Sequence, residues 1–328
     1  MPKPRRDITG RRSRELSVLT PVQIPSLFRN AGERAARRFV EFFTADIRNA
    51  NTRQAYARAV IRFSDWCDQR ELRLEQLNPP IVAAYIEQLM TEMAAPTVKL
   101  HLSAIRALCR YLVVGHGLEF NPAASVRAPK HKVAKGKTPV LQPDQARQLL
   151  DSIGDVKIVD LRDRALIAAV LFSFGRVSAV LGMDLVDYFA DGKRFWLRLH
   201  EKGGKYHEVP VHHTAEQYLD EYISAAGIGA DGRDPLFRSV DRSGTLTKRR
   251  LLRQEVLKMI KRRARAAGLP DRIGCHTFRA TGITAYMLNG GSLEHAQKIA
   301  AHASPETTKL YDRTKDEITL DEIERILI

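Results

Sequence analysis

Residues 127–139 (RAPKHKVAKGKTP) separate two long segments whose hydrophobic patterns differ. This stretch contains basic residues, two prolines and a glycine but almost no apolar side chains, which is typical of a linker. A chain of 328 residues is also long for one small domain, and its 44% hydrophobic content suffices for more than one core. The sequence therefore predicts two folded domains joined by a cationic linker.

The segment 36–126 shows helical periodicity throughout. Asn51 or Thr52 is a candidate N-cap for one helix, and Asn78 precedes two prolines that favour the start of another. About four helices are expected, which is enough for a compact bundle. Residues 1–35 are rich in arginine and have few apolar anchors, so we expect them to form a flexible basic arm.

The segment 140–328 mixes two periodicities. A helix is expected to start at Gln142-Pro143-Asp144, and the apolar run 161–174 predicts a buried helix. Apolar and polar residues alternate over 195–200, and a turn with two glycines and a second alternating run follow, which predicts a β-hairpin. The rest is expected to be helical. The fold class predicted is mainly α, with a small antiparallel β-sheet in the second domain.

The net charge of +15 favours a polyanionic partner. No apolar run approaches the roughly 20 residues that span a bilayer, so nucleic acid is the expected partner rather than a membrane. Cys67, Cys109 and Cys275 lack metal-ligand spacing, and their odd number argues against a disulfide framework. We expect a protein of the reducing cytoplasm, associated with the nucleoid, that uses no metal or other cofactor.

Two arginines and a histidine have the positions of phosphate ligands. Arg176 follows the apolar run, where an arginine needs an anionic partner. His276 and Arg279 are spaced i, i+3 on one helix face, where they can hold a phosphate oxygen and move a proton. Taken singly, Arg176 is as readily explained by structure, and an isolated His-x-x-Arg pair is better explained as the start of a surface helix. Arg176 can instead form an ion pair with a nearby carboxylate, for which Asp160, Asp163 and Asp184 are the candidates.

Two further positions complete the set. His302 precedes Ser304-Pro305-Glu306, a favourable helix start, and Tyr311 is expected to project from that helix. Lys202 lies in the glycine-containing hairpin turn, from which a long side chain can reach a substrate, and Lys205 is its rival. A phenol in water has a pKa of about 10, so its attack on a phosphate near neutral pH needs nearby cations.

In this order, the residues resemble the active site of the tyrosine recombinase (phage integrase) family. The matching segments are FGRVSAVLGM, LHEKGGKYHEVPV, HTFRATGITAY and AHASPETTKLYDR. The resemblance covers the whole second domain, and the first resembles the family's helical, SAM-like core-binding domain. It implies a C-shaped two-domain DNA clamp and a site-specific recombinase or integrase that works through a 3′-phosphotyrosyl intermediate without metal or ATP.

The resemblance also implies a role for each matched residue. Tyr311 is expected to be the nucleophile, while Arg176, Arg279 and His302 bind the scissile phosphate. The remaining two are His276, as proton acceptor and phosphate ligand, and Lys202, as the acid for the leaving 5′-hydroxyl.

The chain departs from the family pattern at one position. Many members have an acidic residue three positions after the first arginine, where it supports the active-site histidine, but this chain has Ala179 there. Asp184 and Asp187 are the candidates to replace it.

Basic residues of both domains are candidates for contacts with double-stranded DNA. They are Lys99, Arg106, Arg110, Lys132, Lys135, Lys205, Lys248, Arg249, Arg250 and Arg253. At the chain's end, Thr319 and Glu322 form a capping box that opens a short apolar helix. This helix either packs on its own domain or, as the resemblance implies, is exchanged between protomers of a tetramer on two DNA duplexes.

Two other functions use parts of the same sequence. A type IB topoisomerase has the same nucleophile and phosphate ligands but relaxes DNA as a monomer. A non-catalytic DNA-binding regulator keeps the two domains without the chemistry. Covalent trapping on nicked DNA and a two-site recombination assay separate these three functions.

Overall fold

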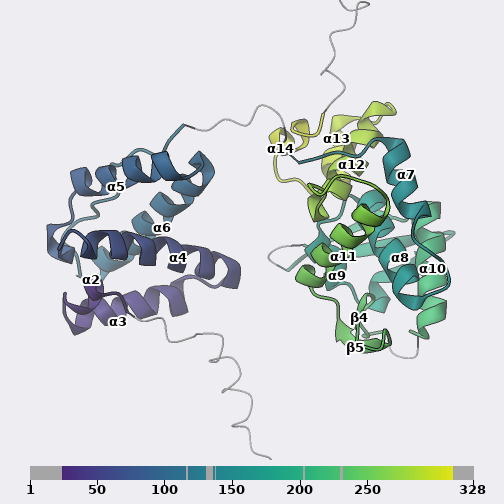
Figure 1. Cartoon of the computed structure of the whole chain (residues 1–328), viewed down its shortest axis with the longest axis horizontal. Helices are drawn as coiled ribbons and strands as arrows, with labels where there is room; N and C mark the ends of the chain where they lie inside the picture. The colour runs from purple at the N-terminus through teal and green to yellow at the C-terminus, as the bar shows by residue number, and fades with distance from the viewer. Residues whose placement is uncertain are drawn as a thin grey trace, which may run out of the picture. The chain divides into compact units, whose positions relative to one another are not determined.

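The computed structural model describes residues 24–115, 117–130, 136, 138–201, 204–229 and 232–312 (Figure 1). The chain divides into two compact units, Met1–Lys132 and Val133–Ile328. Most of the described residues are helical, and small antiparallel sheets lie in the second unit, so the predicted fold class is confirmed. The clamp arrangement of the two domains stays a prediction.

The first unit is a helical bundle around an aromatic core. Its elements are α2 (Ser26–Arg29), α3 (Glu33–Glu41), the π-helical turn η1 (Phe42–Asp46), α4 (Ala50–Asp68), the 3-10 turn η2 (Leu74–Gln76), α5 (Pro79–Glu92) and α6 (Ala95–Val114). Phe28 and Phe39 pack with ring centroids 4.7 Å apart, and Phe63 lies 5.0 Å from Tyr85 by the same measure. All four are buried, so the apolar stripes of the helices meet in one core as the periodicity predicts.

Two expectations for this unit are wrong in detail. The flexible arm does not extend to residue 35, because Leu27 and Phe28 are buried in the bundle and α3 begins at Glu33. The N-cap of α4 is Asn49, whose side-chain oxygen accepts from the backbone N–H groups of residues 51 and 52 at 3.1 Å. Residues 1–23 lie outside the described part.

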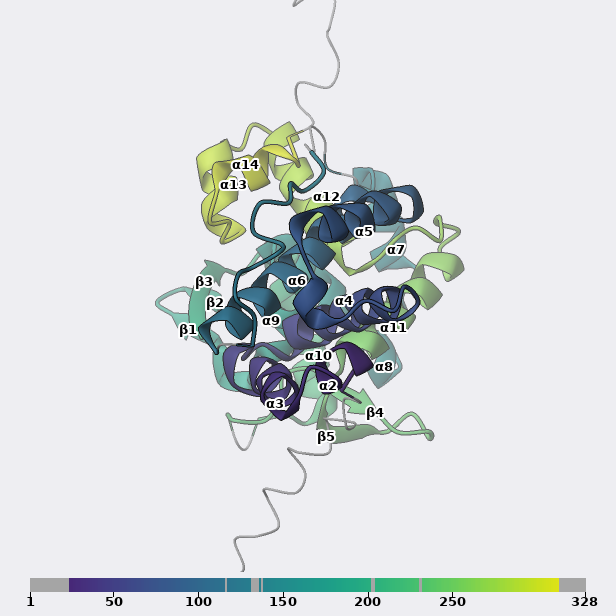
Figure 2. The same ribbon diagram turned by 90° about the vertical axis from the view of Figure 1, so that its left-hand side faces the viewer.

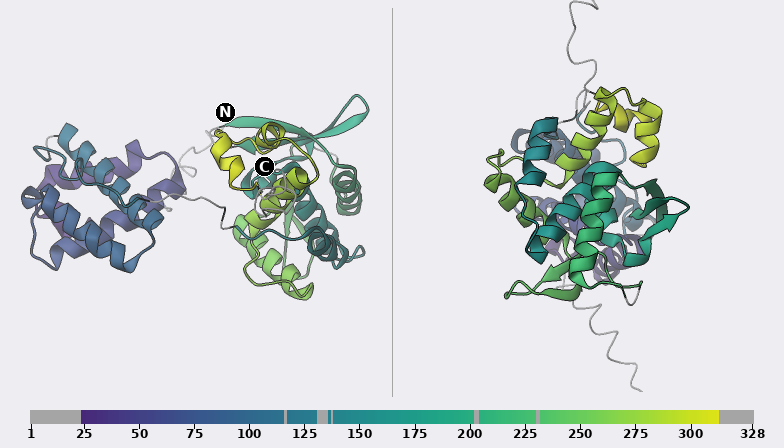
Figure 3. Two further views of the ribbon diagram at one scale, coloured as in Figure 1. Left: turned by 90° about the horizontal axis from the view of Figure 1, so that it is seen from above. Right: turned by 90° about the vertical axis from the view of Figure 1, so that its right-hand side faces the viewer.

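The second unit combines helices with two small sheets. Its elements are α7 (Pro143–Asp151), α8 (Ile158–Ser173), α9 (Val177–Gly182), η3 (Leu185–Asp187), β1 (Tyr188–Asp191), β2 (Arg194–Glu201), β3 (Lys205–Pro210), α10 (His213–Ala226), β4 (Arg238–Val240), β5 (Leu246–Arg250), α11 (Arg253–Ala266), α12 (Cys275–Leu288), α13 (Leu293–Ile299) and α14 (Pro305–Lys309). Helices α8 and α10 pack side by side, and α8 is the more deeply buried of the two (Figures 1 and 3).

The predicted hairpin is formed by β2 and β3, and β1 extends it to an antiparallel sheet in the order β1-β2-β3. Leu197 and Leu199 face the core, in keeping with the alternation in the sequence. The expectation that the rest is helical is wrong for β4 and β5, which form a second hairpin at the opposite end of the unit from α13 and α14 (Figures 1 and 2). These strands are short and polar, so their alternation is weak.

Helix α12 packs almost backbone to backbone against α8. A Cβ atom on Gly282 would lie 2.0 Å from the carbonyl oxygen of Leu171 and 2.9 Å from the ring of Phe174, so only glycine permits this approach. The contact brings one face of α12 to the C-terminus of α8. A small core of Phe174, Ile283, Met287, Ala296 and Ala300 then joins α12 to α13, with Tyr311 packed at its edge. Within the described ranges, no helix combines the length and apolarity that a bilayer crossing requires.

Candidate active site

Arg176 lies at the junction of α8 and α9, where the chain turns sharply. Phe174 ends α8 in the left-handed region, with φ of 52°, and Arg176 occupies the N-cap position of α9. The guanidinium of Arg176 donates to Glu201 of β2 over 2.5 Å. The three aspartates considered as its partners are engaged elsewhere: Asp160 and Asp163 with Arg263 of α11, and Asp184 with Arg250 of β5. Arg176 thus forms an ion pair, but the prediction of an aspartate as its partner is wrong.

Arg279 is buried within α12 and held by two backbone carbonyls. Its Nη2 donates to the carbonyl oxygen of Ala300 at 2.6 Å, and its Nη1 donates to that of Phe174. Both carbonyls lie at strained points, since Phe174 has a φ of 52° and Ala301 one of 47°. Non-glycine residues rarely adopt such angles, and they persist where the surrounding structure requires them. Here they direct two carbonyl oxygens at one guanidinium and fix its orientation.

The guanidiniums of Arg176 and Arg279 lie close enough to repel each other. Burial, and then the charge of Arg176, lower the pKa of Arg279 to about 10, while Tyr311 and Glu201 act in the opposite direction. Two cations gathered at one place favour an anion between them, and Arg176 remains partly exposed to receive it.

His302 and Tyr311 stack against each other beside these arginines. Their rings lie 5.7 Å apart between centroids and are nearly parallel, at 9°. His302 is 7% exposed, and its Nδ1 lies 2.9 Å from the hydroxyl of Thr308. Burial, with the charges of Arg279 and Arg176, lowers the pKa of His302 to about 4, so the imidazole is neutral at physiological pH.

The chain places Tyr311 just beyond a helix rather than on it. Ser304 caps α14 as expected, accepting from the N–H of Glu306, but the helix ends at Lys309. The expectation that Tyr311 projects from this helix is wrong, because Tyr311 lies two residues beyond its end. Its backbone is fixed instead by its N–H, which donates to Thr308 O at 2.9 Å, and by its carbonyl, which accepts from the Thr284 hydroxyl of α12 at 3.0 Å.

His276 stands one helical turn before Arg279, as the i, i+3 spacing predicts. The side chain of His276 is exposed while that of Arg279 is buried, so His276 lies at the surface of the site and Arg279 in its interior. Partial desolvation lowers the pKa of His276, and the charges of Arg253, Arg279 and Arg176 lower it further. Arg253, at the start of α11, therefore belongs to the surroundings of this imidazole.

The hairpin that carries Lys202 reaches the same region, although Lys202 itself lies outside the described residues. On β3, His207 places its Nε2 2.9 Å from the carbonyl oxygen of Ile299, at the C-terminus of α13. Lys205 begins β3 and pairs in register with Glu201. The strands that bracket the turn are thus anchored next to the Ala300–His302 segment.

The structure therefore brings together five of the six residues expected in catalysis, from four separate parts of the second unit. They are Arg176, His276, Arg279, His302 and Tyr311. Two guanidiniums and two imidazoles beside a phenol form a site that can bind a phosphate and attack it.

Sequence reasoning missed Glu201. A signal was present, because Glu201 continues the inward-facing register of Leu197 and Leu199 on β2, and an inward carboxylate needs a cation. Neither candidate replacement for the acid missing at Ala179 reaches the site: Asp184 pairs with Arg250, and Asp187 lies 2.7 Å from His200.

Several arginines proposed for DNA contact are engaged within their own unit. Arg106 donates to the carbonyls of Ala123 and Val126, Arg250 to those of Leu181 and Met183 at 2.7 Å, and Arg249 pairs with Glu255 at 2.9 Å. Arg110 and Arg253 are exposed and Lys99 is partly so, while Lys132 and Lys135 lie outside the described residues.

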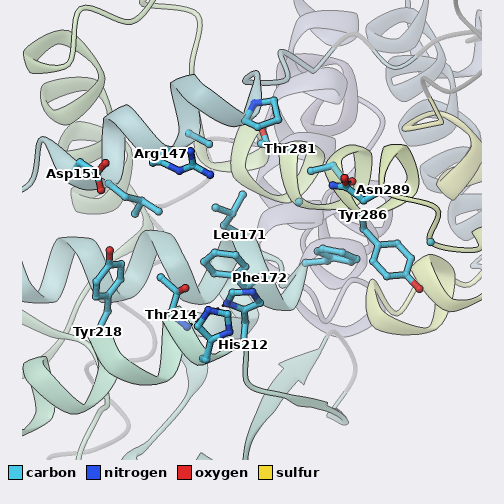
Figure 4. A pocket seen from close by; sticks show the side chains of 18 of the residues that line it. Arg147, Asp151, Leu171, Phe172, His212, Thr214, Tyr218, Thr281, Tyr286 and Asn289 are labelled. Atoms are coloured by element: carbon cyan, nitrogen blue, oxygen red, sulfur yellow. Dashed lines mark hydrogen bonds between the residues drawn. The ribbon is translucent and has the colours of Figure 1, made fainter.

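A pocket of about 890 Å³ lies between α7, α8, α10 and α12 (Figure 4). Its lining includes Leu171, Phe172 stacked on His212, and Tyr218, and contains none of the residues expected in catalysis. It is therefore separate from the phosphate-binding cluster.

Comparison with known proteins yields matches over both units. The family described as "Phage integrase family" matches residues 139–317, and "Phage integrase, N-terminal SAM-like domain" matches residues 37–115. Tyrosine recombinase XerC of Thermodesulfovibrio yellowstonii is 27% identical over 80% of this chain and 85% of its own length. Tyrosine recombinase XerD of Mycobacterium leprae is 28% identical, over 80% of this chain and 86% of its own.

Solved structures match the fold. The XerH recombinase bound to palindromic difH, in a post-cleavage complex, has a TM-score of 0.69 at 20% identity and covers 92% of this chain and 90% of its own. A λ integrase tetramer bound to a Holliday junction has a TM-score of 0.63 at 18% identity, covering 86% of this chain and 78% of its own.

Proposed function

Because the chain belongs to the phage integrase family, we propose that it is a site-specific recombinase that cuts and rejoins DNA through a covalent intermediate on Tyr311. One observation carries the proposal: the Tyr311 ring lies against the buried His302, beside the converging guanidiniums of Arg176 and Arg279. The curated relatives that align with most of the chain are tyrosine recombinases, which is the enzyme class expected from the sequence.

We propose that three groups of this cluster bind the scissile phosphate. Arg176 and Arg279 each offer guanidinium donors to the non-bridging oxygens, and His302 offers an imidazole N–H. Because Arg279 and His302 are buried and oriented before DNA arrives, they stabilise the five-coordinate transition state with little reorganisation. Each well-placed donor of this kind contributes roughly 3 to 4 kcal/mol to the transition state.

The proposed reaction exchanges one phosphoester bond for another. The Tyr311 oxygen bonds to phosphorus, and the bond from phosphorus to the 5′-oxygen breaks. His276 accepts the phenolic proton, and Lys202 donates a proton to the leaving oxygen. The resulting 3′-phosphotyrosyl link retains the ester bond, so attack by the 5′-hydroxyl of another strand reseals the DNA without ATP or a metal.

We propose the domain plan expected from the sequence for this function. It consists of a basic arm, a helical core-binding domain that was expected over 36–126 and begins with α2 and α3 in the structure, a linker over 127–139 and a catalytic domain over 140–328. Solved structures of the same fold are bound to DNA, and one is a tetramer on a Holliday junction, which supports DNA as substrate and self-association of this chain. Of the proposed DNA contacts, Lys99, Arg110 and Arg253 keep accessible side chains.

The C-terminal helix expected over 319–328 lies outside the described residues, and we propose that it is exchanged between protomers. We propose that the pocket in Figure 4 binds this helix of a neighbouring protomer, because the pocket is partly apolar and, at about 890 Å³, large enough for several side chains. Truncation after Lys315 tests this: a chain that assembles on two-site DNA as well without its tail excludes the exchange.

Covalent trapping tests the chemistry. A DNA duplex carrying a target site with a nick just 3′ of the scissile phosphate loses its short 5′-hydroxyl fragment after attack, so the adduct accumulates. The protein is expected to form a denaturation-resistant adduct that Tyr311→Phe abolishes while DNA binding persists. An adduct that survives Tyr311→Phe excludes the assignment. A two-site assay run beside a supercoil-relaxation assay then separates a recombinase from a topoisomerase.

A further inference from the structure

Arg176 has one acceptor among the described residues, the carboxylate of Glu201. The oxygen Oε2 of Glu201 lies 2.5 Å from Nη1 of Arg176. Glu201 comes from the last position of β2, 25 residues after Arg176, so the pair joins the hairpin to the junction between α8 and α9. No pattern near Arg176 in the sequence indicates this partner.

The carboxylate lies on the inner side of the guanidinium. The side chain of Glu201 is 10% exposed and that of Arg176 is 37% exposed, so Glu201 contacts Arg176 from the protein interior. A guanidinium has five N–H donors, and only one of those of Arg176 is taken by a described residue. The other donors stay free for a phosphate, so Glu201 fixes the orientation of Arg176 without occupying its ligand position.

The charge of Glu201 also acts on the second arginine. Arg176 lowers the pKa of Arg279, and Glu201 raises it. A carboxylate placed here therefore reduces the repulsion between two cations that must share one anion. Oε1 of Glu201 is buried and makes no hydrogen bond to a described residue.

We propose that Glu201 is the positioning carboxylate of this active site: it orients Arg176 and lowers the repulsion between Arg176 and Arg279 before DNA binds. Glu201 thereby supplies an acidic group to a site that has Ala179 at the position where the family pattern has an acidic residue. The acidic group comes from β2 and not from the helix after Arg176. The proposal rests on the proposed function, because Arg176 matters here as a phosphate ligand.

The test compares Glu201→Gln with the wild-type protein in single-turnover cleavage of the nicked DNA. Loss of orientation is expected to slow formation of the Tyr311 adduct about 10- to 100-fold, since small misplacements of a reacting group cost up to about that much. DNA affinity is expected to be unchanged or slightly higher, because a negative charge is removed. The matched control is Glu208→Gln, which removes an exposed carboxylate on β3 that pairs with the partly exposed Arg198 at 2.8 Å, and it is expected to cleave at the wild-type rate.

A double-mutant cycle shows whether Glu201 acts through Arg176. In an Arg176→Ala background, Glu201→Gln is expected to cause no further loss, because the group that it orients is absent. An equal loss in both backgrounds overturns the proposal. So does a Glu201→Gln protein that cleaves as fast as or faster than wild type, the result expected if Glu201 instead blocks the phosphate.

A second substrate excludes action through the neighbouring Lys202. With sulfur in place of the 5′-bridging oxygen, the leaving thiolate needs no proton, so a defect that arises at the general acid disappears. The Glu201→Gln defect is expected to persist on this substrate, and its disappearance overturns the proposal. If wild-type protein forms no Tyr311-dependent adduct at all, the proposed function fails, whereas a normal Glu201→Gln protein beside an active wild type defeats only this inference.

Discussion

The Nε2 atom of His207 lies 2.9 Å from the carbonyl oxygen of Ile299. This contact joins β3, the strand that follows the Lys202 turn, to the C-terminus of α13. The next residue, Ala300, supplies a carbonyl to Arg279, and His302 follows two positions later. One hydrogen bond thus connects the hairpin expected to carry the general acid to the segment that orients the phosphate ligands.

His207→Ala is expected to slow adduct formation about 2- to 10-fold, since one hydrogen bond contributes about 0.5 to 1.5 kcal/mol. DNA affinity is expected to stay within twofold of the wild-type value. His207→Gln keeps a side-chain N–H donor and is expected to recover part of the rate. The rates are measured in single turnover on the nicked duplex, and a His207→Ala rate equal to wild type shows that the contact has no role in the chemistry.

Arg279→Ala is expected to impair stability as well as cleavage. The change leaves the carbonyls of Phe174 and Ala300 buried without their donor, which costs roughly 2 to 4 kcal/mol of unfolding free energy. Cleavage is expected to fall by about 100-fold or more. Chemical denaturation and adduct formation measure the two effects. The control Arg198→Ala removes a partly exposed arginine of β2 and is expected to have little effect on stability or on adduct formation. An Arg279→Ala protein as stable as this control contradicts the role of Arg279 in binding the two carbonyls.

His302 gives the stability of the second unit a defined dependence on pH. Its pKa falls from 6.5 in the unfolded chain to about 4 in the folded one, because of burial and the nearby arginines. Between these values the unfolded chain binds more protons at this position, so the contribution of His302 to the free energy of unfolding is constant above about pH 6.5 and decreases as the pH falls toward 4. The lowered pKa of His276 acts with the same sign.

Denaturant unfolding at pH 7 and pH 5 measures this dependence. Between pH 7 and pH 5 the free energy of unfolding of the His302→Asn protein is expected to fall by about 1 to 2 kcal/mol less than that of the wild-type protein. This difference does not depend on the stability of the variant at pH 7. Equal losses in the two proteins contradict the assignment of a neutral, buried His302.

Gly136 contacts the residue that precedes Tyr311. Its N–H donates to the carbonyl oxygen of Leu310 at 3.1 Å, and a Cβ atom added at Gly136 would lie 2.6 Å from that oxygen. Gly136→Ala is therefore expected to displace the Leu310–Tyr311 segment and to slow adduct formation several-fold, roughly up to 10-fold. Gly229→Ala, where an added Cβ meets nothing within 4 Å, is the control. Equal rates in these two variants contradict a role for the Gly136 contact.

DNA binding is expected to weaken steeply with salt. The net charge of +15 and the exposed basic side chains predict many phosphate contacts. For 6 to 10 contacts, the affinity falls by about 10³- to 10⁵-fold between 50 mM and 200 mM salt. Fluorescence anisotropy over a salt series measures the slope, and a flat response contradicts binding through the DNA backbone.

Local signals in the sequence predicted much of the fold. Ser304 caps α14 as expected, because an N-cap depends on residues two or three positions away. The β2–β3 hairpin follows from alternation and a glycine turn. The polar strands β4 and β5 gave no such pattern and were missed, and Asn49 caps α4 in place of the expected Asn51 or Thr52.

The sequence by itself determined the family, which is confirmed, and the identity and order of the candidate catalytic residues. The two-domain organisation follows from the sequence as a prediction. Only the tertiary structure decided what each of these residues contacts. Arg176 pairs with Glu201, and Arg279 binds the carbonyls of Phe174 and Ala300, because the close packing of α12 on α8 and the register of β2 bring them together. Periodicity reports which face of a helix or strand is buried, but the partner on that face depends on residues far away in the chain.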